Sequence, residues 1–168
     1  MELWGLYTRD RHPTSETHIR GDKLPPERYH LVVHVWIRNS RGEWLISQRA
    51  ASRPTFPLKW ECAGGSVPAG EDSQTGAIRE AEEEVGVKLD PAQGKLVSST
   101  VREHFQDIKD VWCFTYDGPV DLANATTDEV ADVRWMSAEA VRTLYDAGEL
   151  VHTLGYFFDE PELGGQDG

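Results

Sequence analysis

The pattern of apolar and polar positions predicts a protein built mainly of strands. Runs rich in Val, Ile, Trp, Tyr and Phe, alternating or continuous, are typical of β-strands. These runs cover Glu2–Thr8, Tyr29–Ile37, Glu43–Gln48, Lys95–Arg102, Asp110–Tyr116 and Val130–Met136. The turn sequence Asn39-Ser40-Arg41-Gly42 between the second and third runs predicts a β-hairpin over residues 29–48.

Two segments have the pattern of helices. Asp72–Glu84 begins with residues that favour a helix N-terminus and ends before Gly86, which suits a left-handed C-cap. Ser137–Ala147 begins with an N-capping serine and places three apolar side chains on one face. Strands mixed with two helices predict an α/β (α+β) fold, in which helices sandwich a mixed sheet.

The two ends of the chain differ from its middle. Glu2–Ile19 predicts an additional strand or hairpin, which either covers a sheet edge or builds a homodimer. Asp159–Gly168 holds four acids, three glycines and no base, and it predicts a mobile acidic tail. No linker interrupts residues 1–158, so we expect them to form one domain.

Composition excludes several classes of protein. The 168 residues carry 29 acidic and 17 basic side chains, and a hydrophobic content of 39 % is sufficient for a core. Neither a signal peptide nor an apolar run of the ~20 residues that cross a bilayer is evident. The net charge of −12 argues against a nucleic-acid duplex as partner. Two cysteines, Cys62 and Cys113, cannot build a dense disulfide framework, so we expect a cytoplasmic protein without a membrane partner.

The charge is also divided unevenly along the chain. Residues 1–60 have ten basic and six acidic side chains, whereas residues 61–168 have seven basic and 23 acidic ones. This asymmetry predicts two halves that contribute different groups to one site.

The strongest candidate chemistry lies on the first predicted helix. Glu80, Glu83 and Glu84 stand at i, i+3 and i+4, so their carboxylates share one face. Crowding of this kind is unfavourable near a helix C-terminus unless a cation is present. A hard cation such as Mg²⁺ fits, because it prefers oxygen ligands and is usually bridged to substrate phosphates. The alternative is a solvated acidic face, which is the usual role of such a run.

The residues before the helix favour the metal site over the solvated face. Gly64, Gly65 and Gly70 let the backbone turn tightly and bring a carbonyl close to an ion or a phosphate. Arg79, beside the glutamates, can orient a carboxylate through a bidentate pair.

The segment Gly65–Val87 resembles the Nudix box, G-x5-E-x7-R-E-U-x-E-E-x-G-U with U an apolar residue, and every fixed position is matched. The resemblance implies the Nudix fold, a Mg²⁺ or Mn²⁺ cofactor, and hydrolysis of a diphosphate joined to another group, X. It implies that Arg79 orients carboxylates. It also implies a set of metal ligands, namely Glu71, Glu80, Glu83, Glu84 and the carbonyl of Gly64.

The reaction also needs a base that activates water. Glu129, six residues before Trp135, resembles the loop glutamate that some Nudix pyrophosphohydrolases use as base. An ordinary exposed loop acid is the alternative interpretation. Glu83 of the box and Asp110, at the start of a strand run, are further candidates.

Several other side chains are candidates for binding substrate or metal. Arg49, Arg53 and Lys59 could bring cations to the phosphates, or they could serve only solubility. Three aromatic residues could stack on a base, although core packing is the commoner role; these are Phe56, Trp60 and Trp112. His30 and His34 share one face of a strand, where packing or hydrogen bonding is favoured over a metal site.

Most of residues 29–90, and again residues 129–135, also resemble isopentenyl-diphosphate isomerases. The position of the isomerase cysteine falls on Gly64, however, and that of a metal-binding histidine falls on Ser66. The leading hypothesis is therefore a metal-dependent hydrolase of a small nucleoside-diphosphate-type or other organic diphosphate. An isomerase-like enzyme and a non-catalytic nucleotide-binding module are the alternatives.

Overall fold

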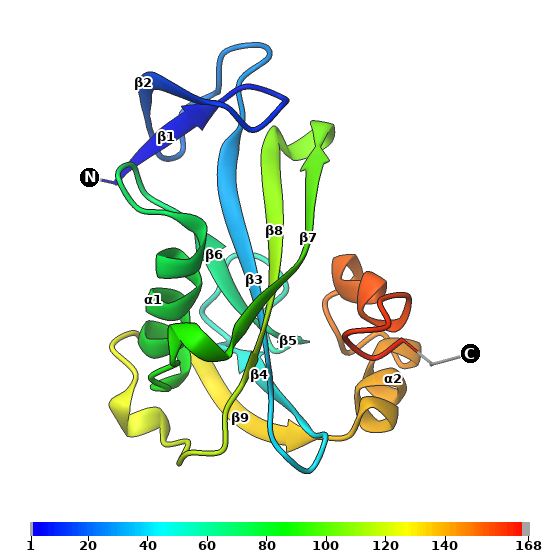
Figure 1. Cartoon of the computed structure of the whole chain (residues 1–168). Helices are drawn as coiled ribbons and strands as arrows, with labels where there is room; N and C mark the ends of the chain where they lie inside the picture. Colours follow the sequence, from blue (N-terminus) through cyan, green and yellow to red (C-terminus); the bar gives the residue numbers. More distant parts are fainter. Residues whose placement is uncertain (1, 166–168) are drawn as a thin grey trace.

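The computed structural model describes residues 2–165, and its centre is a seven-stranded mixed β-sheet with α-helices on both sides (Figure 1). Five strands lie in the order β5-β4-β3-β8-β7, while β6 pairs with β3 and β9 pairs with β4. The strands are β3 (His30–Arg38), β4 (Trp44–Arg49), β5 (Trp60–Glu61), β6 (Ala63–Ser66), β7 (Gly94–Arg102), β8 (Asp107–Thr115) and β9 (Val130–Met136).

Two α-helices and four short 3-10 helices complete the structure. The helices are α1 (Ser73–Val85), α2 (Ala138–Asp146), η1 (Pro91–Gln93), η2 (Glu103–Phe105), η3 (Leu122–Asn124) and η4 (His152–Phe158). A separate hairpin of β1 (Leu3–Tyr7) and β2 (Pro13–Ile19) lies at one end of the sheet (Figure 1). No helix within residues 2–165 is long and apolar enough to span a membrane.

The alternation of side chains along β3 divides the core into two layers. Leu31, Val33 and Val35 belong to a buried cluster on the α1 side of the sheet. Trp36 belongs to a second cluster on the other side, with Phe157 of η4 and residues of α2. The expected fold, a mixed sheet sandwiched between helices, is confirmed.

The ends of α1 confirm the predicted caps. The side chain of Asp72 accepts a hydrogen bond from the backbone N–H of Thr75 at 2.8 Å. Gly86 has φ of 71°, the left-handed conformation that glycine adopts at low cost. The helix therefore begins and ends where the sequence places its caps, and this fixes which face carries the glutamates.

The predicted hairpin over residues 29–48 is confirmed only at its turn. β3 and β4 pair at Arg38 and Trp44, and beyond that point the two strands separate. The ladder positions of β3 are taken by β6 on one side and by β8, in parallel, on the other. A turn signal specifies the local reversal of the chain, but it does not specify which strand occupies each edge further along.

Both ends of the described chain pack on this core. In the β1–β2 hairpin, Trp4 and Leu6 are buried, and Arg11 contacts Asp110 of β8 at 2.5 Å, so the hairpin covers one end of the sheet. Near the C-terminus Leu163 is buried in the second cluster, and the N–H of Gly164 donates to Phe157 O at 3.0 Å. Packing therefore extends beyond the predicted domain boundary at residue 158. Residues 166–168 of the expected tail lie outside the described residues, and the homodimer stays a prediction.

Candidate active site

A cavity of about 410 Å³ brings the predicted chemical groups together. Residues from α1, from the segment 64–70, which we call the glycine loop, and from the loop before β9 line it. The lining includes the predicted metal ligands. We call it the carboxylate cavity. Its lining comprises Glu2, Arg20, Arg53, Gly64, Gly65, Ser66, Pro68, Glu71, Arg79, Glu80, Glu83, Glu84, Thr127 and Glu129.

Arg79 lies among three of the glutamates in this cavity. Its Nε contacts Glu71 at 3.0 Å, and its Nη1 lies 3.0 Å from carboxylate oxygens of both Glu80 and Glu83. Burial lowers the pKa of the Arg79 guanidinium, but its hydrogen bonds to Glu71 and Glu80 outweigh this and raise that pKa above its ordinary value. Arg79 therefore contacts three of the carboxylates that the resemblance implies it orients.

The fourth glutamate, Glu84, has a different environment. Its residue is only 6 % exposed, and its Oε1 accepts the backbone N–H of Gly64 at 2.8 Å. Burial, reinforced by the charge of Glu80, raises the pKa of Glu84 well above its ordinary value. Burial likewise raises the pKa of Glu80 to about 7, against the opposing effect of Arg79. Negative charge on these two carboxylates is therefore unfavourable in the metal-free protein, and an added cation would favour it.

The glycine loop is shaped to the glutamates. A Cβ on Gly65 would lie 2.6 Å from the carboxyl carbon of Glu80, and a Cβ on Gly64 would lie 2.4 Å from Val33 O of the paired strand. Both positions therefore need glycine for β6 to run this close to α1 and β3.

The donor set fits a hard divalent cation in its chemistry, although it is not arranged as a closed site. All the candidate donors are oxygens, which Mg²⁺ and Mn²⁺ prefer. No group of three or more His, Cys, Asp or Glu side chains within residues 2–165 is arranged to hold a metal ion. The reason is visible at Arg79, because its guanidinium holds Glu71, Glu80 and Glu83. An ion that binds these carboxylates has to replace some of the contacts of Arg79.

Glu129 reaches the same cavity from the loop before β9. The backbone N–H groups of Thr126 and Thr127 donate to Glu83 O at 2.9 and 3.3 Å, which fixes this loop against the last turn of α1. Arg53 contacts the Glu129 carboxylate at 2.9 Å. The side chain of Glu129 is 44 % exposed, so solvent reaches it.

A second hollow of about 280 Å³ adjoins the first and shares Arg20, Arg53 and residues 64–66 with it. We call it the arginine chamber, and Arg49, Arg102 and His34 also line it. Arg49 is paired with Glu61 at 3.0 Å, and burial raises the pKa of the Glu61 carboxyl. Two of the three predicted substrate-binding cations, Arg49 and Arg53, therefore lie at the site.

Arg20 and Arg102 also line these hollows, and no sequence motif marks either residue. Arg20, which follows β2, contacts Glu2 at 2.5 Å, and Arg102 pairs with Asp107 at 2.6 Å. Both come from segments far from the box in sequence. The positive balance of residues 1–60 was the only signal that pointed toward Arg20.

Lys59 and Asp110 are not among the residues that line the two hollows. The Nζ of Lys59 donates to Gly148 O at 2.7 Å. Asp110 is fully buried on the α1 side of the sheet, where it accepts from Ser99 at 2.6 Å and pairs with Arg11. Neither side chain is placed to contact a substrate in the carboxylate cavity.

The candidate aromatic and histidine residues have structural partners. Trp112 donates to Ser73 Oγ at 2.7 Å and Trp60 is buried, while Phe56 lines a different hollow. His30 stacks on Trp4 with ring centroids 3.8 Å apart, and His34 hydrogen-bonds Tyr156. Packing and hydrogen bonding are thus confirmed for the histidines.

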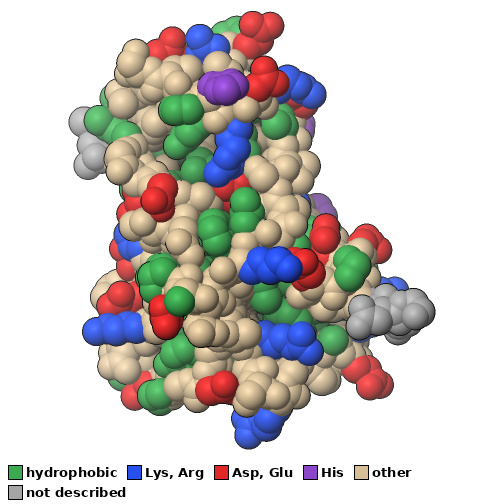
Figure 2. All heavy atoms as spheres, viewed as in Figure 1, with side chains coloured by type: hydrophobic (Ala, Val, Ile, Leu, Met, Phe, Trp, Pro, Cys, Tyr) green, Lys and Arg blue, Asp and Glu red, His purple; other side chains and the backbone are tan. Residues whose placement is uncertain are grey.

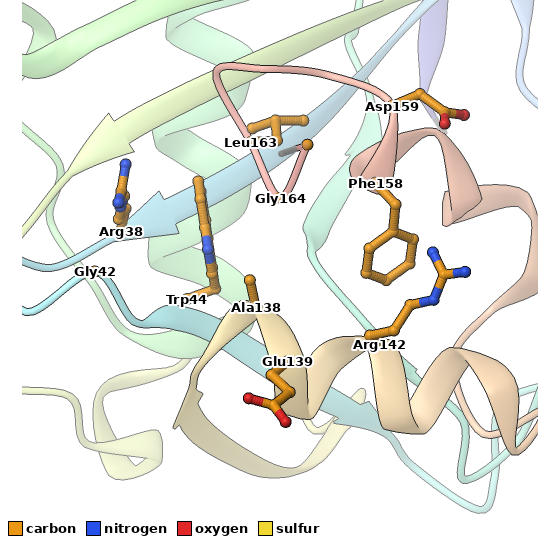
Figure 3. A pocket seen from close by; sticks show the side chains of 11 residues that line it. Arg38, Gly42, Trp44, Ala138, Glu139, Arg142, Phe158, Asp159, Leu163 and Gly164 are labelled. Atoms are coloured by element: carbon orange, nitrogen blue, oxygen red, sulfur yellow. The ribbon is translucent and has the colours of Figure 1, made fainter. Parts of the chain in front are cut away.

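A larger hollow, about 1040 Å³, lies elsewhere, between the β3–β4 turn, α2 and the C-terminal segment (Figure 3). The guanidinium carbon of Arg38 lies 5.3 Å from the ring centroid of Trp44, and that of Arg142 lies 4.8 Å from the ring centroid of Phe158. None of the predicted site residues lines it, so its size does not indicate where the chemistry takes place.

On the face in Figure 2, acidic and basic side chains are interspersed, and no large area carries charge of one sign.

Comparisons with known proteins agree with this geometry. A family described as NUDIX domain matches residues 28–154. An uncharacterized Nudix hydrolase from Listeria innocua is 40 % identical over 162 residues, which cover 94 % of this chain and 91 % of the relative. A crystal structure of a protein from Deinococcus radiodurans superposes with a TM-score of 0.69 at 23 % identity, covering 89 % of this chain and 92 % of that one.

The mixed sheet between helices and the glutamates of α1 in the carboxylate cavity are the features of a Nudix-type hydrolase. The chain belongs to the Nudix family. A more distant relation is also present, because isopentenyl-diphosphate Δ-isomerase from Escherichia coli is 28 % identical over 127 residues, covering 70 % of this chain and 67 % of the isomerase. The predicted family and its isomerase-like character are confirmed.

Proposed function

We propose that this chain is a Mg²⁺- or Mn²⁺-dependent hydrolase that cleaves a diphosphate linkage in a small organic substrate, a nucleoside diphosphate or a related compound. The observation that carries this proposal is the meeting of four box glutamates, the glycine loop and Glu129 around one cavity. Arg20 and Arg53, which line both hollows, support it, since guanidinium groups suit phosphate oxygens.

Glu80, Glu83 and Glu84 would hold the ion, with Glu71 and the Gly64 carbonyl as further donors. When bound, a divalent ion neutralises charge on phosphoryl oxygens and lowers the pKa of water. Glu129 accepts the proton of the attacking water, because its carboxylate lies in the same cavity, open to solvent. Arg53, which lines both hollows, orients Glu129 and contacts a phosphate of the substrate.

The proposal is tested by incubating the pure protein with nucleoside di- and triphosphates, dinucleotides, sugar nucleotides and prenyl diphosphates. We expect turnover of at least one class with Mg²⁺ or Mn²⁺ and none with EDTA. Glu83→Gln and Glu84→Gln should lower the rate at least 100-fold. Glu82→Gln is the matched control, because Glu82 lies on the same helix but does not line the cavity. Turnover unaffected by Glu83→Gln, or absent for every compound, would contradict the proposal.

Isomerisation is the runner-up activity and has its own readout. Proton exchange into isopentenyl diphosphate in deuterated water, followed by NMR, separates it from hydrolysis. We expect no exchange, because Gly64 and Ser66 stand where the isomerase has its cysteine and a metal histidine. Tight nucleotide binding without any turnover would instead favour a non-catalytic binding module.

A further inference from the structure

A buried hydrogen-bond chain ends at the arginine chamber. The Trp36 Nε1–H donates to the hydroxyl oxygen of Tyr156 at 3.0 Å, and that hydroxyl lies 2.7 Å from His34 Nδ1. Trp36 has no exposed surface, and the Tyr156 ring lies under Lys109 Nζ at 3.9 Å. The chain thus joins β3 to η4, whereas the His34 side chain itself lines the chamber.

The donors and acceptors in this chain fix the proton on His34. An indole can only donate, so the Tyr156 oxygen accepts from Trp36. If His34 Nδ1 also donated, the Tyr156 hydroxyl proton would have no acceptor among residues 2–165. Tyr156 therefore donates to Nδ1, and the imidazole carries its proton on Nε2. An imidazole that accepts at Nδ1 and carries its proton on Nε2 is neutral.

The Nε2–H is free to bind a ligand. It makes no hydrogen bond within residues 2–165, and it is not sealed from solvent. The buried side-chain atoms without a partner in that part of the chain are Trp4 Nε1, His30 Nδ1 and Asp110 Oδ2. His34 lies in the part of the chamber that the carboxylate cavity does not share. If the phosphates bind in the carboxylate cavity, as the proposed function requires, the group X would lie in this part of the chamber.

The charges around His34 favour an uncharged X. Arg49 and Arg102 line only this part of the chamber, and each is already paired with a carboxylate, Glu61 and Asp107 respectively. The neutral imidazole and these two paired guanidinium groups give the chamber polar donors whose positive charge is balanced by carboxylates. Such a surface suits hydroxyl or carbonyl oxygens better than a hydrocarbon or a further anion.

We propose that His34 is a specificity-determining residue whose Nε2–H donates to an uncharged oxygen of X, with Tyr156 as its positioning residue. This rests on the proposed function for the identity of the phosphate side of the substrate. The arginine chamber then selects diphosphates whose X carries hydroxyl groups, over diphosphates of hydrocarbon chains.

The orientation of the ring is tested by ¹⁵N NMR of the labelled protein without ligand. We expect the Nε2–H tautomer of His34 at pH 7, and a mixture of both tautomers in Tyr156→Phe, which has no hydroxyl to donate. A His34 that carries its proton on Nδ1, or that is charged at pH 7, would overturn the proposal. This measurement needs no turnover, so it is independent of whether the protein is a hydrolase.

Selection is tested by calorimetry with two five-carbon probes, ribose 5-diphosphate and pentyl diphosphate, in Ca²⁺ to suppress turnover. We expect tighter binding of ribose 5-diphosphate, and a three- to tenfold loss of that preference in His34→Ala, the range of one neutral hydrogen bond. Binding of pentyl diphosphate should stay within twofold. His152→Ala is the matched control, since His152 is exposed and lies outside the chamber. Equal binding of the two probes, binding of neither, or a preference that survives in His34→Ala refutes the proposal.

Discussion

The carboxylates of α1 should make the metal-free protein less stable as the pH rises, and Glu80 gives the magnitude. The fold raises the pKa of Glu80 from 4.5 to about 7, so the folded protein binds a proton at Glu80 that the unfolded chain has already lost. The free energy of unfolding therefore decreases between pH 4.5 and 7 because of Glu80, and this decrease is complete above pH 7. At 1.36 kcal/mol per pH unit the upper limit is about 3 kcal/mol. Because the side chain is 13 % exposed, we expect about 2 kcal/mol.

Glu80→Gln isolates this contribution, because glutamine can still accept a hydrogen bond from Arg79 but cannot ionise. We measure the free energy of unfolding by urea titration in EDTA, followed by tryptophan fluorescence. The free energy of the variant minus that of the wild type should increase by about 2 kcal/mol between pH 5 and pH 8. Mg²⁺ should reverse the gain at pH 8, because it stabilises only the ionised wild-type site. A difference between the two proteins that is constant with pH would refute the reasoning, and Glu82→Gln serves as the control.

Three further perturbations test single contacts. Glu129→Gln should lower kcat by about 10²- to 10⁴-fold with little change in KM, while Asp128→Asn leaves both near wild type. Arg11→Ala removes the cation from the buried Asp110 and should cost about 2 kcal/mol in urea unfolding; an unchanged midpoint would show that the β1–β2 hairpin is not held there. Leu163→Ala should cost about 2–4 kcal/mol, and an unchanged Tm would contradict the packing of the C-terminal segment.

Local chemistry made the centre of the site predictable from sequence. Asp72 and Gly86 specify the two ends of α1 through their own backbone preferences, so the face that carries Glu80 and Glu84 follows from the helical repeat. β9 spans the predicted residues 130–136, because polar and apolar residues alternate over residues 132–135 and the run is rich in residues that favour strands. In these cases the signal and the structure lie within a few residues of each other.

Long-range pairing was not predictable in the same way. The parallel contact of β3 with β8 joins His30 to Asp107, and nothing near either residue encodes it. The short strands β5 and β6 have too few residues for an alternating pattern, and their pairing is determined by the sheet that receives them. Lys59 illustrates this gap, because it lies next to β5 and the sequence does not indicate where that short strand pairs.

The uneven charge along the chain does not produce a surface of one sign at the site, because the basic and acidic side chains there form ion pairs. Each arginine of the two hollows other than Arg79 is paired with one carboxylate; the pairs are Arg20–Glu2, Arg49–Glu61, Arg53–Glu129 and Arg102–Asp107. A phosphate must therefore compete with a carboxylate for its guanidinium group. Arg53 is the informative case, because its partner is the proposed base. If the proposed function holds, a substrate phosphate that contacts Arg53 weakens the ion pair between Arg53 and Glu129. Binding of the substrate would then free the Glu129 carboxylate to act as the base.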